Sequence, residues 1–516
     1  MSGLWDVSKY EIGWSLKERN MRRIVNSEEM RECDRNTIEY FGIPSLVLME
    51  RAALSVADSI PKEFMHERIL VVCGNGNNGA DGLAVARLLQ QRGCEVTVAQ
   101  MPDTGKRSKE NQVQRNILEQ YGFCILDAVP EDSQYACVID ALFGVGLSRA
   151  PKKEFAEWIG QMNRLLGYKV AVDMPSGVSS DTGEAYPASF QADLTVTFAY
   201  QKLGQLLYPG REKCGIVKVA DIGITDDSWL DRKPFCYAPE KAELYHLPHR
   251  PPRSNKGTFG KLLVIAGSKN MAGAALFCAQ AAYGTGCGLV KIHTPEENRM
   301  ILQSALPEAI LSVYEEKRPK TELLDTAIQW ADVIAIGPGL GTGKQARRMV
   351  EQTLEYADVP LVADADALNI LAQRPELLAR TKAPLIITPH LGEMARLCGK
   401  QISDIQNTML QTAVSFAKSN HLVCVLKDAV TVTTDGTDVY LNTSGCSAMA
   451  KGGSGDVLTG IIAALLAQGM TPKDAAYMGV YIHGLAGEAA AAQVGIYSVL
   501  ARDIVAAIGR ALQIRQ

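Results

Sequence analysis

The sequence predicts an α/β protein of two domains, each built around a largely parallel sheet. Three observations point to this fold. The chain has 516 residues, which at about 150 residues per domain is too long for a single hydrophobic core. Short apolar runs rich in β-branched residues alternate with helical patterns, as they do in βαβ units. This alternation lapses over residues 226–255, where Pro and charged residues accumulate, and we expect a linker there.

The first half predicts an open, Rossmann-like sheet with helices on both faces. A helix is expected over residues 83–92, and the other helical patterns also separate strands, which indicates parallel crossovers. In chain order, the expected strands are Arg68–Cys73, Glu95–Ala99, Ala136–Ile139, Lys169–Val172 and Leu194–Phe198.

The second half repeats this alternation without repeating the sequence. A helix is expected over residues 273–284, and Asp435-Gly436 predicts a hairpin between short strands at 431–434 and 438–441. We therefore expect two unrelated domains, residues 21–225 and 256–516, after an N-terminal extension of residues 1–20. The other expected strands are Lys261–Ala266, Leu289–His293, Val333–Ile336, Leu361–Asp364, Leu385–Ile387 and Val423–Lys427.

Composition excludes several classes of protein. Apolar residues make up 47% and charged residues 21%, the balance of a globular protein able to bury a core. A net charge of -4, without a basic patch, argues against nucleic acid or anionic membrane as partners. The 12 cysteines form no C-x-x-C pair, the apolar runs are too short to span a membrane, and the charged first 20 residues do not resemble a secretory signal. We expect a cytoplasmic protein with reduced thiols.

A glycine-rich segment, residues 74–82, follows the first strand and precedes a helix. Its backbone amides could approach a phosphate, and it satisfies the G-x-G-x-x-G pattern of dinucleotide-binding enzymes. A nicotinamide dehydrogenase is disfavoured because the next strand ends at Gln100, without a carboxylate for a ribose hydroxyl. Asn77, Asn78 and Asp81 indicate instead a site for a cation or for proton transfer. A purely structural turn is the alternative.

Two further segments place polar residues after expected strands. Asp140 precedes a Gly-rich stretch, and Asp173 begins the run Asp173-Met174-Pro175-Ser176. Because ligands of open α/β sheets bind at the carboxyl ends of strands, these residues are expected to converge on the first loop. Alternatively, each Asp merely caps a helix.

A second loop, Gly453-Ser454-Gly455-Asp456, leads into an apolar helix near the C-terminus. Successive amides at a helix start form an anion hole for a transferring phosphoryl group. Asp456 is placed to accept the proton of an attacking hydroxyl, as phosphoryl transfer requires. An ordinary capped helix start is the alternative.

Residues 24–224 resemble the epimerase domain of the NAD(P)H-hydrate repair system, in the entry segment at residues 43–50 and in the three loops in order. Ala80 and Arg51 depart from the usual Gly and Asn of the family. The resemblance implies that Asn78, Asp140 and Ser176 bind K⁺ and that Asp173 is the acid or base that epimerises the hydrates at C6. The residues implied to contact the hydrated nucleotide are Asn77, Asn78, Gly79, Ala80, Asp81, Gly144, Val145, Gly146, Leu147, Ser148, Arg149, Ala150 and Asp173.

Residues 250–516 resemble the ribokinase-like superfamily, and within it the NAD(P)H-hydrate dehydratases. The carrying motifs occupy residues 256–261, 266–275, 337–341, 362–368 and 388–393, besides the Gly453–Asp456 loop. The resemblance implies an α/β/α sandwich. It implies that Ala274, Gly339, His390 and Asp456 contact the hydrate, with Asp456 as the base. Lys427, Asp428, Ala429, Val430, Thr431 and Gly455 are implied to bind the nucleotide.

Together the two resemblances imply a bifunctional enzyme that repairs hydrated NADH and NADPH. The N-terminal half would interconvert the R and S hydrates. The C-terminal half would dehydrate the S epimer at the expense of ADP, giving AMP and phosphate, because phosphate leaves more readily than hydroxide. The implied cofactors are K⁺ in the first domain and Mg²⁺ with ADP in the second, and we expect a homo-oligomer. The alternative is a ribokinase-like vitamin or sugar kinase with an N-terminal ligand-binding or scaffold module.

Overall fold

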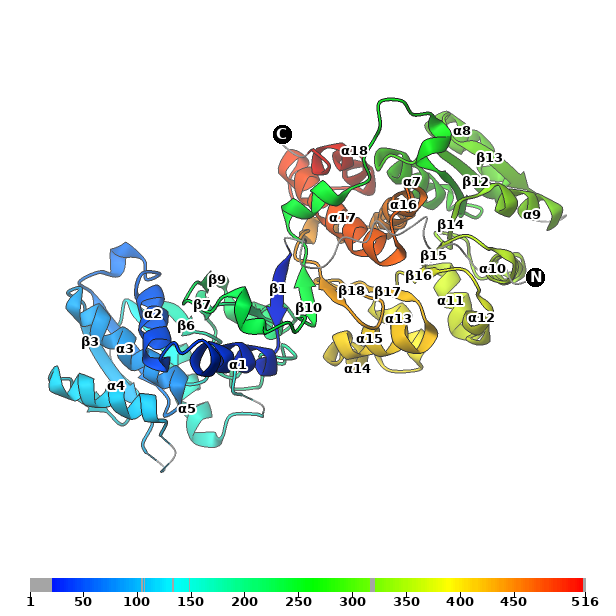
Figure 1. The fold of residues 1–516 in the computed structure, drawn as a ribbon. Helices are drawn as coiled ribbons and strands as arrows, with labels where there is room; N and C mark the ends of the chain where they lie inside the picture. The colour runs from blue at the N-terminus through cyan, green and yellow to red at the C-terminus, as the bar shows by residue number, and fades with distance from the viewer. Residues whose placement is uncertain are drawn as a thin grey trace. The chain divides into compact units, whose positions relative to one another are not determined.

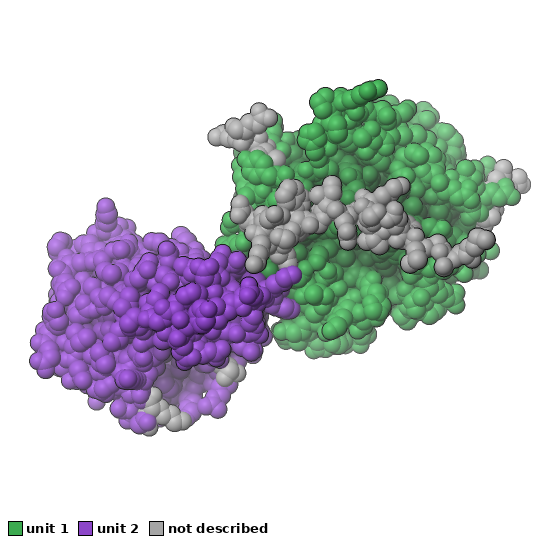
Figure 2. All heavy atoms as spheres, in the orientation of Figure 1, with its two compact units in different colours: residues 1–22, 236–516 green, residues 23–235 purple. Residues whose placement is uncertain are grey.

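The structure is a computed structural model that describes residues 21–513, apart from residues 104, 106, 132, 133, 148 and 316–320. The extension expected at residues 1–20 and the candidate site residue Ser148 lie outside the described residues. The described chain forms two compact units (Figure 2). The N-terminal unit is Arg23–Phe235, and the C-terminal unit comprises Met21, Arg22 and the residues from Cys236 onward.

The N-terminal unit contains a 7-stranded sheet in which every pairing of neighbouring strands is parallel (Figure 1). The strand order is β4-β3-β2-β5-β6-β7-β9, so the direction of winding reverses between β2 and β5. This is the crevice at which open α/β sheets bind ligands. The strands are β2 (Arg68–Cys73), β3 (Glu95–Gln100), β4 (Ile125–Leu126), β5 (Cys137–Ala141), β6 (Tyr168–Val172), β7 (Leu194–Phe198) and β9 (Ile216–Ala220).

Helices cover both faces of this sheet because successive strand residues point to opposite sides. Ile69 and Val71 share a hydrophobic core with α2 and α3, while Leu70 and Val72 share another with α5. A short parallel pair, β1 (Arg22–Val25) with β8 (Gln201–Lys202), brings Val25 beside Lys202. The helices are α1 (Ser27–Arg35), α2 (Ser45–Ala57), α3 (Asn77–Gln91), α4 (Lys109–Gln120), α5 (Lys153–Arg164) and α6 (Gly210–Cys214).

The C-terminal unit contains a longer sheet in the order β13-β12-β11-β14-β15-β16-β17-β18-β19-β10. Strand pairings are parallel as far as β17 and antiparallel through the β18–β19 hairpin, which is the hairpin that Asp435-Gly436 predicts. The strands are β10 (Cys236–Ala238), β11 (Lys261–Ile265), β12 (Leu289–Pro295), β13 (Ile310–Tyr314), β14 (Val333–Ile336), β15 (Leu361–Ala363), β16 (Leu385–Ile387), β17 (Val423–Leu426), β18 (Val432–Thr434) and β19 (Val439–Leu441).

This sheet is also covered on both faces, as the sandwich expected from the sequence requires (Figure 1). Leu262 and Val264 share one hydrophobic core with α7, α16, α17 and α18. Leu263 and Ile265 alternate with them and are fully buried too. The helices are α7 (Ala272–Gly284), α8 (Arg299–Ala305), α9 (Thr321–Trp330), α10 (Lys344–Tyr356), α11 (Asp366–Gln373), α12 (Glu376–Arg380), α13 (Leu391–Cys398), α14 (Ile402–Asn407), α15 (Met409–Asn420), α16 (Ser454–Ala467), α17 (Pro472–Val494) and α18 (Ala501–Ala511).

Two features differ from the expectation. The segment 226–255, expected as a linker, contributes strand β10, which pairs with β19. Helix α3 begins at Asn77 instead of residue 83. Gly79 and Gly82 have poor helix propensity, but a Cβ at Gly79 would lie 2.0 Å from Gly74 O, and one at Gly82 would lie 2.4 Å from the Ala141 side chain. Close packing against β2 and β5 therefore decides where the helix starts.

Among the helices that the structure describes, none combines the length and the apolar composition needed to cross a bilayer.

Candidate functional sites

The N-terminal unit has a pocket of about 210 Å³ at the carboxyl ends of its strands. Helix α3 contributes Asn77 and Asp81, the loop after β5 contributes Val145, and the end of β6 contributes Asp173. Apolar side chains of α1 and α2 form the opposite wall. The structure therefore brings the first loop and the Asp173 segment together, as expected from the strand order.

Asp173 forms a buried ion pair with Lys202 in this pocket. Lys202 Nζ lies 2.7 Å from Asp173 Oδ1, and it also donates to Thr197 Oγ1 at 2.7 Å. The Lys202 side chain is 1% exposed. Lys202 belongs to no motif that would predict it from the sequence, and it reaches the pocket through the short β1–β8 pairing. A Lys buried to this degree beside a carboxylate indicates a built site, since an unpaired buried charge is strongly unfavourable.

The Asp173 carboxylate is oriented from several sides. Thr197 Oγ1 donates to Oδ1 at 3.1 Å, and the backbone N–H of Val145 donates to Oδ2 at 3.2 Å. The backbone φ of Asp173 is 66°, in the left-handed region that non-Gly residues seldom adopt. Gln205 Nε2 donates to the Asp173 carbonyl at 2.7 Å and supports this conformation. Such strain is stored most often at functional sites.

Asp140 and Ser176 are fully buried and bonded to each other. Ser176 Oγ donates to Asp140 Oδ1 at 2.7 Å, and Ser176 N donates to Oδ2 at 2.7 Å. Burial raises the pKa of Asp140 to about 6, against the opposing effect of hydrogen bonds from Ser176 and Leu142. This pair ties the end of β5 to the loop after β6.

Asn78 approaches Asp173 across Gly144. A Cβ at Gly144 would lie 2.9 Å from Asp173 Oδ2 and 3.0 Å from Asn78 Oδ1, so both oxygens border one small space. Asn78 Nδ2 is buried and has no hydrogen-bond partner among the described residues. Hard cations prefer oxygen ligands from amide, carboxylate and hydroxyl groups. Asn78, Asp140 and Ser176 carry one of each, which fits a weakly held monovalent cation.

Three further carboxyl groups, those of Asp34, Asp81 and Glu110, line the pocket. The pKa of Asp81 is raised well above its usual value by burial, with Asp173 and Asp34 adding like-charge repulsion. Burial also raises the pKa of Asp34, reinforced by Asp173 and Glu110 and partly offset by Lys202. Groups that favour the protonated form and a Lys-paired carboxylate thus share one cavity, an arrangement suited to acid–base chemistry.

The other candidates of this unit lie more peripherally. Val145 is the residue of the 144–150 segment that lines the pocket among those described, whereas Gly146, Arg149 and Ala150 are exposed. Ala80 is fully buried in α3. Arg51 is half exposed and faces Asp221 at 3.7 Å.

In the C-terminal unit, Lys427, Asp364 and Thr459 form one polar centre. Lys427 Nζ lies 2.9 Å from Asp364 Oδ1, and Thr459 Oγ1 donates to Asp364 Oδ2 at 2.8 Å. Asp364 follows β15, Lys427 follows β17, and Thr459 belongs to α16. Lys427 was expected to bind the nucleotide. Asp364 lies in the motif at residues 362–368, but neither it nor Thr459 was expected at the site.

Asp456 lies in the first turn of α16, directly after the anion-hole glycines. The helix is capped by Gly453, whose φ of 92° is accessible chiefly to Gly. Burial raises the pKa of Asp456 to about 7, and Asp364 raises it further while Lys427 opposes the rise. A Cβ at Gly455 would lie 3.5 Å from Lys427 Nζ and 3.7 Å from Asp364 Oδ2. The glycine loop, Asp364 and Lys427 therefore enclose one space.

His390 caps helix α13 beside this centre. Its Nδ1 accepts hydrogen bonds from the backbone N–H of Gly392 at 3.0 Å and of Glu393 at 3.4 Å. Nδ1 is therefore unprotonated, and Nε2 of the exposed ring lies 3.4 Å from Glu393 Oε1. Burial raises the pKa of Glu393 to about 6. Lys427 N donates to Pro389 O at 2.8 Å, which places the His390 turn next to Lys427.

Gly339 and Ala274 are in direct contact, and a Cβ at Gly339 would lie 2.8 Å from the Ala274 side chain. Of the turn between β17 and β18, Asp428 and Ala429 are exposed, whereas Val430 is buried. The candidates for hydrate binding and nucleotide binding thus lie on several separate turns at the same end of the sheet.

Fold and sites define the class of the protein: an open α/β acid–base unit followed by a ribokinase-like phosphoryl-transfer unit. Residues 262–510 match the family model of NAD(P)H-hydrate dehydratase, and residues 45–204 match that of the YjeF-related protein N-terminus. The bifunctional NAD(P)H-hydrate repair enzyme of Moorella thermoacetica is 38% identical, over 93% of this chain and 95% of that protein. The Escherichia coli enzyme of the same name is 36% identical, over 94% and 93%.

The chain belongs to the family of bifunctional NAD(P)H-hydrate repair enzymes. Among solved structures, a ribokinase-like superfamily protein from Enterococcus faecalis is 30% identical, covering 55% of this chain and 96% of that chain, with a TM-score of 0.50. The ADP/ATP-dependent NAD(P)H-hydrate dehydratase of Bacillus subtilis, co-crystallised with ATP and Mg²⁺, is 32% identical, covering 53% and 96%, with a TM-score of 0.47.

Proposed function

We propose that the N-terminal unit interconverts the R and S hydrates of NADH and NADPH, and that the C-terminal unit dehydrates the S hydrate using ADP. The observation that carries this proposal is the pairing of two complete sites in one chain. One site contains a Lys-paired Asp173, and the other contains Asp456 at an anion-binding helix start. A vitamin or sugar kinase would leave the first site without a purpose.

Dehydration requires a better leaving group than hydroxide. Asp456 accepts the proton of the C6 hydroxyl while that oxygen attacks the terminal phosphorus of ADP and AMP departs. The amides of Gly453 to Gly455 stabilise the charge on the transferring group. Phosphate then leaves C6 with its bonding electrons, and loss of a proton from C5 restores the dihydropyridine. Lys427 and Asp364 border Gly455 of this loop, and His390 would contact the hydrate.

Epimerisation requires the C6–O bond, or the ring, to open and close with the opposite configuration. Asp173 is the acid or base of this step because Lys202 and Thr197 hold its carboxylate in place within the pocket. Asn77, Asn78 and Asp81 contact the nucleotide from the first turns of α3. Among the described residues of the segment 144–150, Val145 lines the pocket and would contact the nucleotide.

Two cations complete the proposal. Asn78, Asp140 and Ser176 would hold K⁺, which would fix the oxygen ligands and balance their charge. Mg²⁺ would enter with the phosphates of ADP and neutralise their negative charge. The part of the chain that the structure describes has no cluster of three or more His, Cys, Asp or Glu side chains suited to a metal, so the phosphates would supply most Mg²⁺ ligands.

We further propose a reducing compartment, the cytoplasm, and a homo-oligomer. All 12 cysteines are free, and most are buried. The exposed apolar side chains of Ile496, Tyr497 and Leu500 occupy one short segment of the C-terminal unit. Light scattering on the purified chain tests the oligomer, which requires a mass well above 55.9 kDa.

The decisive experiment measures the return of the absorbance of reduced nicotinamide from a mixture of R and S hydrates. Purified enzyme receives ADP, ATP or no nucleotide. We expect full recovery with ADP and none without nucleotide. Asp456→Asn should leave only the spontaneous rate. If a folded sample returns no absorbance with either nucleotide, the dehydratase assignment is wrong and the kinase alternative gains support.

A further inference from the structure

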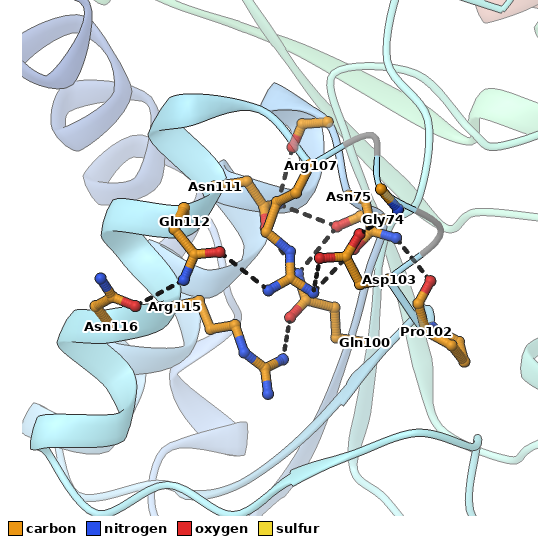
Figure 3. Close-up of polar contacts among 12 residues, drawn as sticks. Gly74, Asn75, Gln100, Pro102, Asp103, Arg107, Asn111, Gln112, Arg115 and Asn116 are labelled. Carbon is orange, nitrogen blue, oxygen red and sulfur yellow. Dashed lines mark hydrogen bonds and ion pairs between the residues drawn. The ribbon is translucent and has the colours of Figure 1, made fainter.

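A network of amide side chains holds the first glycine-rich loop of the N-terminal unit on its side facing α4 (Figure 3). Asn111, the third residue of α4, is fully buried. Its Nδ2 donates to Gly74 O at 3.1 Å and to Gly76 O at 2.9 Å. Its Oδ1 accepts from Gln100 Nε2 at 2.8 Å. One side chain therefore ties two loop carbonyls to the end of β3.

The network continues to the surface through Gln100. Gln100 is 2% exposed, and its Nε2 also lies 3.3 Å from Gly74 O. Its Oε1 accepts a hydrogen bond from Arg115 Nη1 at 2.6 Å. Every donor of the two amides thus meets an acceptor. An amide is required at position 111, because only a side chain with two N–H donors and one oxygen satisfies these three partners.

The two carbonyls belong to the start of α3. Gly76 O also accepts the first hydrogen bond of that helix, from Ala80 N at 3.1 Å. Asn77, Asn78 and Asp81 project from the same turns. By fixing Gly76 O, Asn111 fixes the position from which these side chains enter the pocket. Asp173 is held separately by Lys202 and Thr197, so it does not depend on this network.

We propose that Asn111, supported by Gln100 and Arg115, is a positioning residue that sets the affinity of the N-terminal pocket for the hydrated nucleotide. The proposal rests on the epimerase function proposed above. It assigns the network to substrate binding and leaves the acid–base step to Asp173. Damage to the network is therefore expected to raise KM, whereas damage to Asp173 lowers kcat.

Asn111→Asp is the sharpest variant because it keeps the shape of the side chain. It turns the donor of two hydrogen bonds into an acceptor that faces two carbonyl oxygens. Asn116→Asp is the matched control, since Asn116 is exposed on the same helix and bonds only to Gln112 among the described residues, at 2.7 Å. Epimerisation is followed without ADP, by chromatographic separation of the two hydrates over time.

For Asn111→Asp we expect KM for the hydrate to rise about 10- to 100-fold, because the loss of two hydrogen bonds to the loop releases the side chains that contact the nucleotide, with kcat within about threefold of wild type. Asn116→Asp should match wild type in both constants. Partial unfolding would lower the active fraction, and hence kcat, without changing KM. An unchanged KM, or a loss confined to kcat, would therefore overturn the proposal.

A second variant and a second readout keep the test independent of folding and of activity. Gln100→Glu retains the contact with Arg115 but removes the donor to Asn111 and Gly74, so a smaller rise in KM is expected. Hydrogen exchange of residues 74–82 should be faster in both variants than in wild type, and equal exchange would overturn the proposal. A wild-type chain that does not epimerise would refute the proposed function, while the exchange result would still decide the role of Asn111.

Discussion

At the scale of single residues, the central carboxyl groups of the two sites have different neighbours. Asp173 is paired with the buried Lys202, whose Nζ lies 2.7 Å from its Oδ1. Asp456 lies among carboxyl groups and apolar surroundings, and its pKa is raised to about 7. A base with a pKa near the working pH is ionised often enough to react and is still basic enough to take a proton.

The raised pKa of Asp456 predicts how the dehydratase depends on pH. Because the ionised form accepts the proton, the dehydration rate should rise through pH 7 and level off above it. Asp456→Asn should lower the dehydration rate at least about 10²-fold, to the spontaneous rate, while ADP still binds. Rates and ADP titrations across pH 5–9 check this prediction. A variant that keeps more than a tenth of the wild-type rate contradicts Asp456 as the base.

The raised pKa of Asp456 also predicts that the C-terminal unit becomes less stable as pH rises. A folded-state pKa above the unfolded value means that the folded state binds the proton more tightly, so stability falls as pH rises from about 4 to about 7. Asp456→Asn should flatten this dependence and raise the unfolding temperature of the C-terminal unit at pH 8 by about 2–4 °C. Thermal unfolding of both proteins at pH 5 and pH 8 measures it.

The Lys202–Asp173 pair predicts a large loss when one partner is removed. Lys202→Met leaves the Asp173 carboxylate buried without its cation, which destabilises proteins by about 3–5 kcal/mol. Epimerisation should fall together with the stability of the N-terminal unit, as measured by urea unfolding. Lys218→Met is the control, since Lys218 is exposed and donates to Ser59 Oγ at 2.9 Å. Equal stability of the two variants would show that the pair contributes little.

At the scale of elements, both sites lie at the start of a helix that directly follows close-packed glycines. In the N-terminal unit, α3 reaches the pocket because its first turn has no side chain at Gly79. In the C-terminal unit, α16 begins after Gly453 adopts a left-handed conformation. The glycines thus have two functions, because they expose backbone amides to a ligand and let the helix approach its neighbours.

Two neighbouring glycines of the first loop should differ sharply in their tolerance of Ala. A Cβ at Gly79 would lie 2.0 Å from Gly74 O, so Gly79→Ala should destabilise the N-terminal unit by about 1–3 kcal/mol and reduce epimerisation at least tenfold. A Cβ at Gly76 would meet nothing within 4 Å, so Gly76→Ala should change stability by less than about 0.5 kcal/mol. Urea unfolding and hydrate separation compare the two. Equal effects would mean that the contact at Gly79 relaxes easily.

At the scale of the whole molecule, each activity has its site inside one compact unit. In the proposed function, the C-terminal unit dehydrates the S epimer and depends on the N-terminal unit to make the R epimer repairable. Asp173 and Lys202 lie within residues 23–235, and Asp364, Lys427 and Asp456 lie within residues 236–516.

The two activities should therefore be separable and additive. With ADP and mixed hydrates, Asp173→Asn should recover the S fraction quickly and the R fraction only at the spontaneous rate. Asp456→Asn should recover nothing beyond background, yet equilibrate the epimers. Mixing the two variants should restore full recovery. If the mixture recovers no more than Asp173→Asn alone, the hydrate must pass between sites of one molecule.

The sequence alone determined the α/β class, most strands and the two ligand loops. These depend on local patterns: β-branched runs, helical periodicity, and glycines next to Asp456 or Asn78. Helix α3 was placed six residues too late because its glycines lower helix propensity, and tertiary packing overrides that preference. The family resemblance that rests on these motifs is confirmed by relatives that match over most of the chain.

Only the tertiary structure decided which side chains complete the sites. Lys202 pairs with a carboxylate 29 positions away, Lys427 with one 63 positions away, and Asn111 bonds to carbonyls 37 and 35 positions away. No local sequence pattern predicts these contacts, because the order of strands in each sheet decides which distant residues become neighbours. Sequence periodicity reports which face of an element is buried. It does not predict which distant polar group will lie beside a buried one. A buried polar group is stable only when it has a hydrogen-bond or charge partner, and only the tertiary fold supplies that partner.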